Sequence, residues 1–307
     1  MPDREDWLGG LFVPVTTPFD PVTGDVAPVS FRDNLRRWAS EGVDGVVLFG
    51  STGEGALLDE DEKLRLMVLA RDVSALPLVA GAAGESTRAA SRQARRLAEA
   101  GADAILLHPP TYFGPHLSPA GLRDYFLAVA DASPVPVIVY HIPKFTKVTL
   151  DPGLVGELMR HGNIRGLKDS SGDMKRFAEY STVCKGAHRL FIGSGSLLYT
   201  ALELGAAGGI VAMGLIAPGE CARIVQYFRA GNGRKAGEIQ ERIAPVHRDV
   251  VAAFGARGVK AALDLLGYAG GAPRPPLPPL SEKERAQVVR ALQDAGLWHG
   301  PAKDQPA

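Results

Sequence analysis

The chain of 307 residues is 46% hydrophobic, and its 34 lysines and arginines balance its 34 aspartates and glutamates. This length and composition suit a globular protein with a large buried core. A zero formal net charge without basic runs argues against nucleic acid, and no apolar stretch approaches the roughly 18 residues of a membrane span. Residues 1–6 are too polar for a signal peptide, and Cys184 and Cys221 lack metal-ligand spacing. We therefore expect a cytoplasmic protein with no metal and no other cofactor.

Short apolar runs recur along the chain, and each is followed by a longer amphipathic stretch. Runs that are continuously apolar are typical of parallel strands buried on both faces. The eight predicted strands span residues 11–15, 45–49, 77–80, 104–108, 135–140, 164–168, 189–192 and 209–212. Helices are predicted between them at residues 30–41, 59–72, 87–100, 118–130 and 173–184. Four of these helices begin at a typical N-cap residue: Ser30, Asp59, Ser118 and Asp173. Glycines occur where helices are expected to end, at Gly42, Gly101 and Gly205.

Eight strand–helix units in succession predict an α/β fold, a (β/α)8 TIM barrel, in residues 1–215. An open doubly wound sheet is the alternative, but the first predicted strand lacks a Gly-x-Gly-x-x-Gly turn. A C-terminal helical region is predicted at residues 216–297, with helices at 218–230, 234–254, 259–266 and 281–295. The Gly/Pro-rich segment 270–279 predicts an extended connection, and the small, polar tail 298–307 predicts disorder.

Lys168 ends the sixth predicted strand, directly after the apolar run 164–167. A lysine that reaches solvent from a strand end is the commoner arrangement, because burying an ammonium group is costly. In a barrel, however, the C-terminal ends of the strands carry the chemistry. An amine held there in a dry pocket suits Schiff-base formation with a carbonyl substrate.

Two other strand ends carry groups that fit the same chemistry. The second strand ends in Gly50-Ser51-Thr52-Gly53-Glu54, a turn whose backbone N–H groups and hydroxyls can hold a carboxylate, although an ordinary helix-capping turn looks similar. The fifth strand ends in Tyr140, whose phenol can relay protons, the alternative being a packed core tyrosine. Together these residues predict that an amine attacks a 2-oxo acid, a turn binds its carboxylate and a phenol moves protons.

Three motifs in chain order carry a family resemblance: Gly-Ser-Thr-Gly-Glu at 50–54, Tyr-His-Ile-Pro at 140–143 and Gly-Leu-Lys-Asp-Ser-Ser-Gly-Asp at 166–173. With them the chain resembles the dihydrodipicolinate synthase/N-acetylneuraminate lyase family from about residue 10 to 297. The resemblance implies a (β/α)8 barrel with a C-terminal helical extension. It also implies metal-free class I lyase or aldolase chemistry through a pyruvate Schiff base, in a homotetramer built as a dimer of dimers.

The resemblance implies roles for four catalytic residues. Lys168 would form the Schiff base, and Tyr140 would be the general acid/base. Ser51 would supply the hydroxyl of the proton relay. Tyr112, in the stretch 110–113, would reach across a dimer interface to complete the relay, the alternative being an aromatic that only packs there.

The resemblance also implies substrate-binding positions. Thr52 and Gly50 would hold the pyruvate carboxylate, and the backbone at Gly193 and Val211 would line the pocket. Phe145 would face the second substrate, at a position where dihydrodipicolinate synthases carry an arginine that binds a carboxylate. This departure removes a bidentate clamp, and the sequence leaves open whether Lys144 or Lys147 compensates for it.

A second departure concerns sugar substrates, because Gly195-Ser196 replace the acidic pair of sialate lyases. The stretches 193–198 and 267–271 resemble 4-hydroxy-2-oxoglutarate aldolases instead. We therefore predict reversible cleavage of a 4-hydroxy-2-oxo acid or 2-keto-3-deoxy acid to pyruvate and an aldehyde such as glyoxylate. The alternatives are a 4-hydroxy-tetrahydrodipicolinate (dihydrodipicolinate) synthase and a 2-keto-3-deoxy sugar-acid dehydratase. A catalytically silent oligomeric binding protein and a class II metal aldolase are further alternatives, the last weakened by the lack of clustered ligands.

Overall fold

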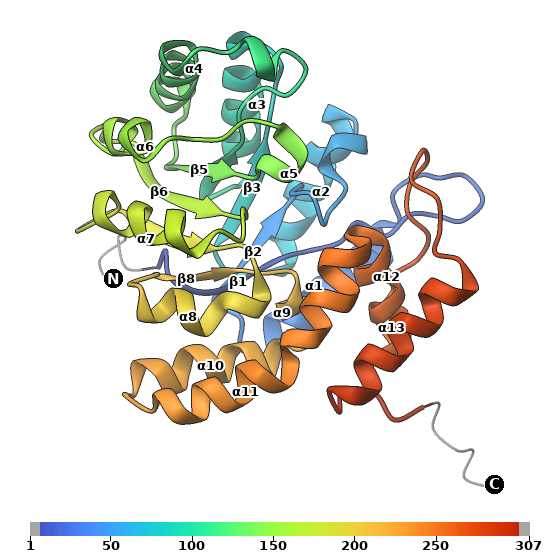
Figure 1. The fold of residues 1–307 in the computed structure, drawn as a ribbon. Helices are drawn as coiled ribbons and strands as arrows, with labels where there is room; N and C mark the ends of the chain where they lie inside the picture. The colour runs from blue at the N-terminus through green and yellow to red at the C-terminus, as the bar shows by residue number, and fades with distance from the viewer. Residues whose placement is uncertain (1–6, 301–307) are drawn as a thin grey trace, which may run out of the picture.

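Eight parallel strands pair in chain order, and the last pairs with the first to close a barrel (Figure 1). This computed structural model describes residues 7–300, so most of the tail predicted at 298–307 lies outside the described residues. The strands are β1 (Gly10–Pro14), β2 (Gly45–Leu48), β3 (Leu78–Ala82), β4 (Ala104–Leu107), β5 (Val137–His141), β6 (Ile164–Asp169), β7 (Arg189–Ile192) and β8 (Gly208–Ile210). The predicted (β/α)8 barrel is thereby confirmed.

Helices connect the strands and surround the barrel (Figure 1). Those that follow β1 to β7 are α1 (Pro28–Ser40), α2 (Glu60–Val73), α3 (Thr87–Glu99), α4 (Pro119–Ala132), α5 (Pro143–Thr146), α6 (Pro152–Leu158), α7 (Met174–Val183) and α8 (Leu198–Glu203). Those that follow β8 are α9 (Met213–Ile216), α10 (Pro218–Arg229), α11 (Gly233–Val246), α12 (Ala256–Leu265) and α13 (Glu282–Asp294). Short 3-10 turns occupy η1 (Gly55–Leu57), η2 (Gly114–His116) and η3 (Gly195–Leu197).

Two predictions about helices need correction. Helix α1 begins at Pro28 with Ala27 as its N-cap, not at Ser30, because proline fits the first helical position, where its missing N–H is not needed. The helix predicted at 234–254 is α-helical only to Val246 and continues as a π-helical segment, η4 (His247–Ala252). Pro245 cannot donate an intrahelical hydrogen bond, so it lies where the regular α-helical ladder gives way.

The barrel strands have two apolar faces because alternate side chains point inward and outward. The inward set fills the barrel and includes Phe12, Val47, Val79, Leu106, Ile138, Tyr140, Phe191 and Ile210. The outward set packs beneath the helices and includes Leu11, Val46, Leu78, Ile105, Val139, Leu167 and Ile192. This double burial explains why the strands are apolar without alternation in the sequence.

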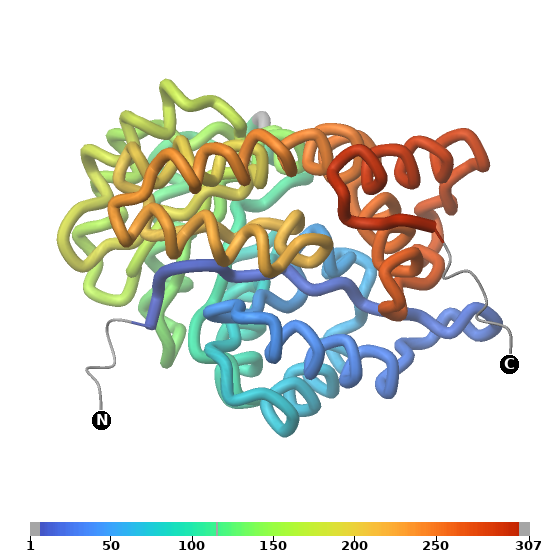
Figure 2. Tube along the Cα trace, turned by 90° about the horizontal axis from the view of Figure 1, so that it is seen from below, coloured from blue at the N-terminus to red at the C-terminus, as the bar shows by residue number. Residues whose placement is uncertain are grey.

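The helices after α11 lie to one side of the barrel, and the extended connection between α12 and α13 reaches back to the loop after β1 (Figure 2). The Arg274 guanidinium in this connection donates to the carbonyl oxygen of Gly24, at 2.8 Å from Nη2. The connection predicted at 270–279 is non-helical, as expected. The division of the chain at residue 215 stays a prediction.

Within residues 7–300, no helix is long and apolar enough to cross a membrane. Over the same residues, no group of three or more histidine, cysteine, aspartate or glutamate side chains is placed to hold a metal ion.

Candidate active site

Lys168 and Tyr140 face each other on adjacent strands inside the barrel. They are partners in the β5–β6 register, and the Lys168 Nζ lies 4.1 Å from the centroid of the Tyr140 ring. Lys168 is 4% exposed and Tyr140 is 5% exposed. The structure thus brings together the two residues expected to carry the central chemistry.

A β-bulge in β6 turns Lys168 into the barrel. Val137 pairs with Ile164, but the next residue, Ile138, pairs with Gly166, so β6 has one extra residue at this point. A shift of one residue moves every later side chain to the opposite face. Without the bulge, Lys168 would point toward the helix layer.

Behind Lys168 and Tyr140, on the outer side of the barrel, the next residues of both strands form a buried polar pair. The His141 Nδ1 lies 2.7 Å from the Asp169 Oδ1, and both side chains are at most 1% exposed. The Ser171 hydroxyl donates to the Asp169 Oδ2 at 2.9 Å, and the Tyr180 hydroxyl lies 3.3 Å from the His141 Nδ1. These contacts join β5, β6 and α7, and they stabilise the register that places Lys168 beside Tyr140.

The predicted carboxylate-binding turn follows β2 at the same end of the barrel. Ser51 is exposed, Thr52 is half-buried and Gly50 is buried. Phe49 and Glu54, which flank the turn, have left-handed backbone angles with φ of 60° and 54°. Such angles are uncommon for residues other than glycine, so the turn depends on the surrounding structure to hold its shape.

Two more strand ends contribute to the mouth of the barrel. A Cβ atom on Gly193, after β7, would collide with the Ser170 hydroxyl, after β6, so glycine leaves room for that hydroxyl. Ser170 was not among the predicted site residues, although it lies two positions after Lys168 and directly after β6. The Val211 side chain is fully buried against the outer core, so only its backbone can line the pocket.

The loop after β7 is held by a half-buried histidine from the π-helical segment η4. The Gly195 N–H donates to the His247 Nδ1 at 3.2 Å, so the ring proton lies on Nε2, 3.0 Å from the Ser194 Oγ. Burial, assisted by the charge of Lys144, lowers the pKa of His247 to about 4. His247 is therefore neutral near pH 7, and it fixes the loop that carries Gly195 and Ser196.

Tyr112 lies apart from Lys168 and Tyr140, in the loop after β4. Its side chain is 79% exposed, and its ring packs against that of Phe113, at 5.0 Å between centroids. The Glu85 carboxylate accepts hydrogen bonds from the backbone N–H groups of Tyr112 and Thr111, which fixes the loop. Within one described chain Tyr112 contacts no other predicted catalytic residue.

Phe145 lies on the short helix α5 and is 56% exposed. Both neighbouring lysines are occupied by backbone carbonyls: Lys144 donates to Ala252 at 3.1 Å, and Lys147 donates to Lys144 at 3.0 Å. The geometry therefore gives no sign that either lysine replaces a guanidinium at position 145.

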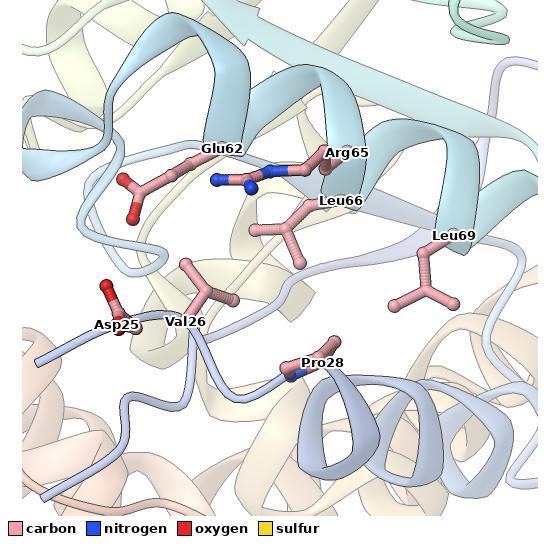
Figure 3. A pocket seen from close by; sticks show the side chains of 7 residues that line it. All are labelled: Asp25, Val26, Pro28, Glu62, Arg65, Leu66 and Leu69. Carbon is pink, nitrogen blue, oxygen red and sulfur yellow. The ribbon is translucent and has the colours of Figure 1, made fainter. Parts of the chain in front are cut away.

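A pocket of about 370 Å³ lies outside the barrel, between α2 and the loop after β1 (Figure 3). Val26, Pro28, Leu66 and Leu69 form its apolar walls, with Asp25, Glu62 and Arg65 at one side (Figure 3). None of the predicted site residues lines it. We place the active site at the mouth of the barrel, because Lys168 and Tyr140 meet there.

Comparison with known proteins shows the family of the chain. The Dihydrodipicolinate synthetase family model matches residues 7–295. The chain belongs to this family. It is therefore an enzyme, a carbon–carbon lyase of the pyruvate-dependent class I aldolase type.

Individual relatives cover nearly the whole chain. A 4-hydroxy-tetrahydrodipicolinate synthase from Syntrophus aciditrophicus is 32% identical over 94% of this chain and 98% of its own length. The dihydrodipicolinate synthase from Acinetobacter baumannii, solved with pyruvate, has a TM-score of 0.89 and 29% identity over 94% of this chain and 99% of its own. A prophage protein of the same family from E. coli K12, also solved with pyruvate, has a TM-score of 0.87 and 28% identity, covering 94% and 99%.

Proposed function

We propose that the Lys168 amine attacks the C2 carbonyl of pyruvate, or of a larger 2-oxo acid, and forms a Schiff base. The bond from Nζ to C2 forms, the carbonyl oxygen leaves as water, and a C=N bond remains. The observation that carries this proposal is a buried lysine facing a tyrosine ring at 4.1 Å, with no carboxylate paired to it in the described part of the chain. Pyruvate in the structures of two relatives supports the same substrate.

The surrounding residues supply the remaining needs of this reaction. Thr52, Gly50 and the backbone of their turn would hold the substrate carboxylate. Tyr140 would pass protons to and from the carbinolamine oxygen and the enamine carbon, with Ser51 in the relay. The exposed Tyr112 would complete that relay in the site of a second copy of the chain, in a homotetramer that we propose from the family resemblance.

The first candidate for the complete reaction is 4-hydroxy-tetrahydrodipicolinate synthase, in which the pyruvate enamine adds to aspartate semialdehyde. The names of the curated relatives favour this reaction over the cleavage predicted from the sequence. The relatives are 32 to 34% identical to this chain.

The second candidate is reversible cleavage of a 4-hydroxy-2-oxo acid or a 2-keto-3-deoxy acid to pyruvate and an aldehyde. The observation in its favour is Phe145, an apolar, half-exposed side chain at the position where a second carboxylate would need a guanidinium. The nearby Lys144 and Lys147 donate to backbone carbonyl oxygens. Both candidates share the Schiff-base chemistry of Lys168. They differ in the aldehyde that is joined to pyruvate or released from it.

Trapping the intermediate tests the shared chemistry. Borohydride reduction in the presence of pyruvate should add one stable pyruvyl mass to the chain, and peptide mapping should place it on Lys168. An adduct on a different lysine, or no adduct at all, would contradict the proposal.

Kinetics on one preparation distinguish the two candidates. We would compare kcat/KM for condensation of pyruvate with aspartate semialdehyde and for cleavage of 4-hydroxy-2-oxoglutarate and a 2-keto-3-deoxy acid. Losing a charge-assisted bidentate contact typically costs a few kcal/mol, about two orders of magnitude. If Phe145 decides the outcome, condensation should be about 100-fold less efficient than cleavage, and Phe145→Arg should recover part of it. Efficient condensation by the unaltered enzyme would establish the synthase.

A further inference from the structure

Lys260 is the second buried lysine among residues 7–300, and the proposed reaction does not use it. It lies on α12, outside the barrel, and is 1% exposed. Its Nζ lies 2.5 Å from the Glu54 Oε1, and the Glu54 side chain is itself fully buried. Lys260 also donates to the carbonyl oxygen of Ala272 at 2.9 Å. A buried ion pair of this kind joins the C-terminal helical region to the residue directly after the 50–53 turn.

The second carboxylate oxygen of Glu54 also accepts a hydrogen bond. The backbone N–H of Arg274 donates to the Glu54 Oε2 at 2.8 Å. Glu54 is thus bound at both oxygens by the segment 260–274, and its left-handed backbone, with φ of 54°, forms the end of the turn. Rotation of this backbone would pull the carboxylate away from both donors.

Arg274 extends the contact to the start of α2. Its guanidinium binds both carboxylate oxygens of Glu62 at 2.6 Å and the carbonyl oxygen of Leu57 at 2.8 Å. The Phe19 ring lies near both cations, 4.3 Å from the Lys260 Nζ and 4.5 Å from the Arg274 Cζ. Glu54 is thus paired with Lys260, and Glu62 with Arg274. Glu62 also borders the outer pocket, so the network ends near the surface (Figure 3).

We propose that Glu54, Lys260 and Arg274 are positioning residues, which hold the 50–53 turn in the shape that binds the carboxylate of the 2-oxo acid. The inference rests on the proposed function, because it assumes that this turn binds the carboxylate. It goes further in assigning the C-terminal region a part in substrate binding. Glu54 directly follows the turn in the chain, so the network acts through the turn and not on the substrate.

The test uses a variant that removes both charges and keeps the side-chain shapes, Glu54→Gln combined with Lys260→Met. Replacing a buried ion pair by neutral groups of similar size is far better tolerated than removing one partner, so the double variant should fold. The full-length enzyme is titrated with pyruvate in the presence of borohydride, and the adduct on Lys168 is quantified by mass. We expect the half-saturating pyruvate concentration to rise about tenfold, with the same adduct mass at saturation.

Methyl pyruvate separates positioning from general loosening of the site. Its carbonyl reacts in the same way, but its carboxylate is masked as an ester. The double variant should shift the titration with pyruvate and leave that with methyl pyruvate within twofold of the unaltered enzyme. An equal shift for both compounds, or a shift below twofold for pyruvate in a folded double variant, would overturn the positioning role.

Asn34→Ala is the matched control. The Asn34 side chain exchanges two hydrogen bonds with the backbone of Ala269, so it anchors the same connection to α1 without touching the turn. It should leave the pyruvate titration unchanged, and an equal tenfold rise in this variant would contradict a specific role for Glu54 and Lys260. If the unaltered enzyme forms no adduct with pyruvate, the proposed function fails before the positioning role is tested.

Discussion

Lys168 and Lys260, the two buried lysines in the described part of the chain, have opposite surroundings. Lys260, at the junction of the barrel and the C-terminal helices, has a carboxylate at 2.5 Å and a backbone acceptor at 2.9 Å. Burial lowers the pKa of Lys260, while the nearby Glu54 carboxylate acts against that shift. Lys168, inside the barrel, lies over the ring of Tyr140, and no carboxylate pairs with it among residues 7–300. Burial alone therefore does not identify a reactive amine; a buried lysine without an anionic partner is the better candidate for covalent chemistry.

The largest expected effect comes from removing the unpaired amine. Lys168→Ala should reduce turnover to the background of the uncatalysed reaction, because the covalent route no longer exists. Steady-state pyruvate release and adduct mass measure this effect. Lys235→Ala is the control, since Lys235 also lies near an aromatic ring, 5.3 Å from the Tyr227 centroid, but on the exposed surface. Substantial turnover by Lys168→Ala would contradict a covalent role for Lys168 and, with it, the proposed functional difference from Lys260.

The partner of Lys168 gives the next effect. Tyr140→Phe should lower kcat about 100- to 10,000-fold, the usual contribution of a placed proton-transfer group. The variant should fold normally, because only one hydroxyl is deleted, and should still form the pyruvate adduct. Tyr268→Phe deletes a hydroxyl that binds Glu41, outside the barrel, and should leave kcat unchanged. A loss below tenfold would identify Tyr140 as a packing residue.

For stability, we expect the opposite: replacing Lys260 should lower the free energy of unfolding more than replacing Lys168. Lys260→Met leaves the Glu54 carboxylate buried and unpaired, which typically costs about 3–5 kcal/mol in the free energy of unfolding. Lys168→Met strands no charge and should change that free energy by less than about 1 kcal/mol. Denaturant unfolding of both variants at pH 7 measures the difference. Equal losses of stability would remove the distinction between a structural and a reactive lysine.

His247, a half-buried base, extends the comparison to pH. The pKa of His247 falls from 6.5 to about 4 on folding, so the unfolded chain binds a proton that the folded chain refuses. The stability that depends on neutral His247 is therefore present above pH 6.5 and is lost as the pH falls toward 4, by up to about 3 kcal/mol. His247→Gln should flatten this part of the stability profile. Parallel pH profiles of thermal unfolding for both proteins would contradict the assignment.

The order of the strands and the residues at their ends could be predicted from the sequence, because apolar runs, capping residues and glycines act locally. Lys168 and Tyr140, which the sequence predicts as site residues, lie next to each other at the mouth of the barrel. The direction of Lys168 could not be derived from alternation, since the bulge between Ile164 and Gly166 reverses it. A hint lies in Gly166, where a Cβ atom would collide with the carbonyl oxygen of Arg189.

Contacts between distant segments had no local signal. Lys260 is separated from Glu54 by 206 positions, and nothing in the composition of α12 indicates that its lysine is buried. The pairing of His141 with Asp169 was missed for a related reason, because the two residues meet only through the register of β5 and β6. Side chains that support a site from behind are set by tertiary packing, and a single sequence carries little information about them.

The exposure of Phe145 has an evolutionary consequence. Lys168 and Tyr140, which we propose to handle pyruvate, are buried on two adjacent barrel strands. Phe145 lies instead on a four-residue helix at the rim, with 56% of its surface in solvent. Substitutions of exposed residues usually change stability by less than about 0.5 kcal/mol. Selection could therefore exchange one aldehyde partner for another at the rim, while the inherited pyruvate chemistry beneath it stays intact.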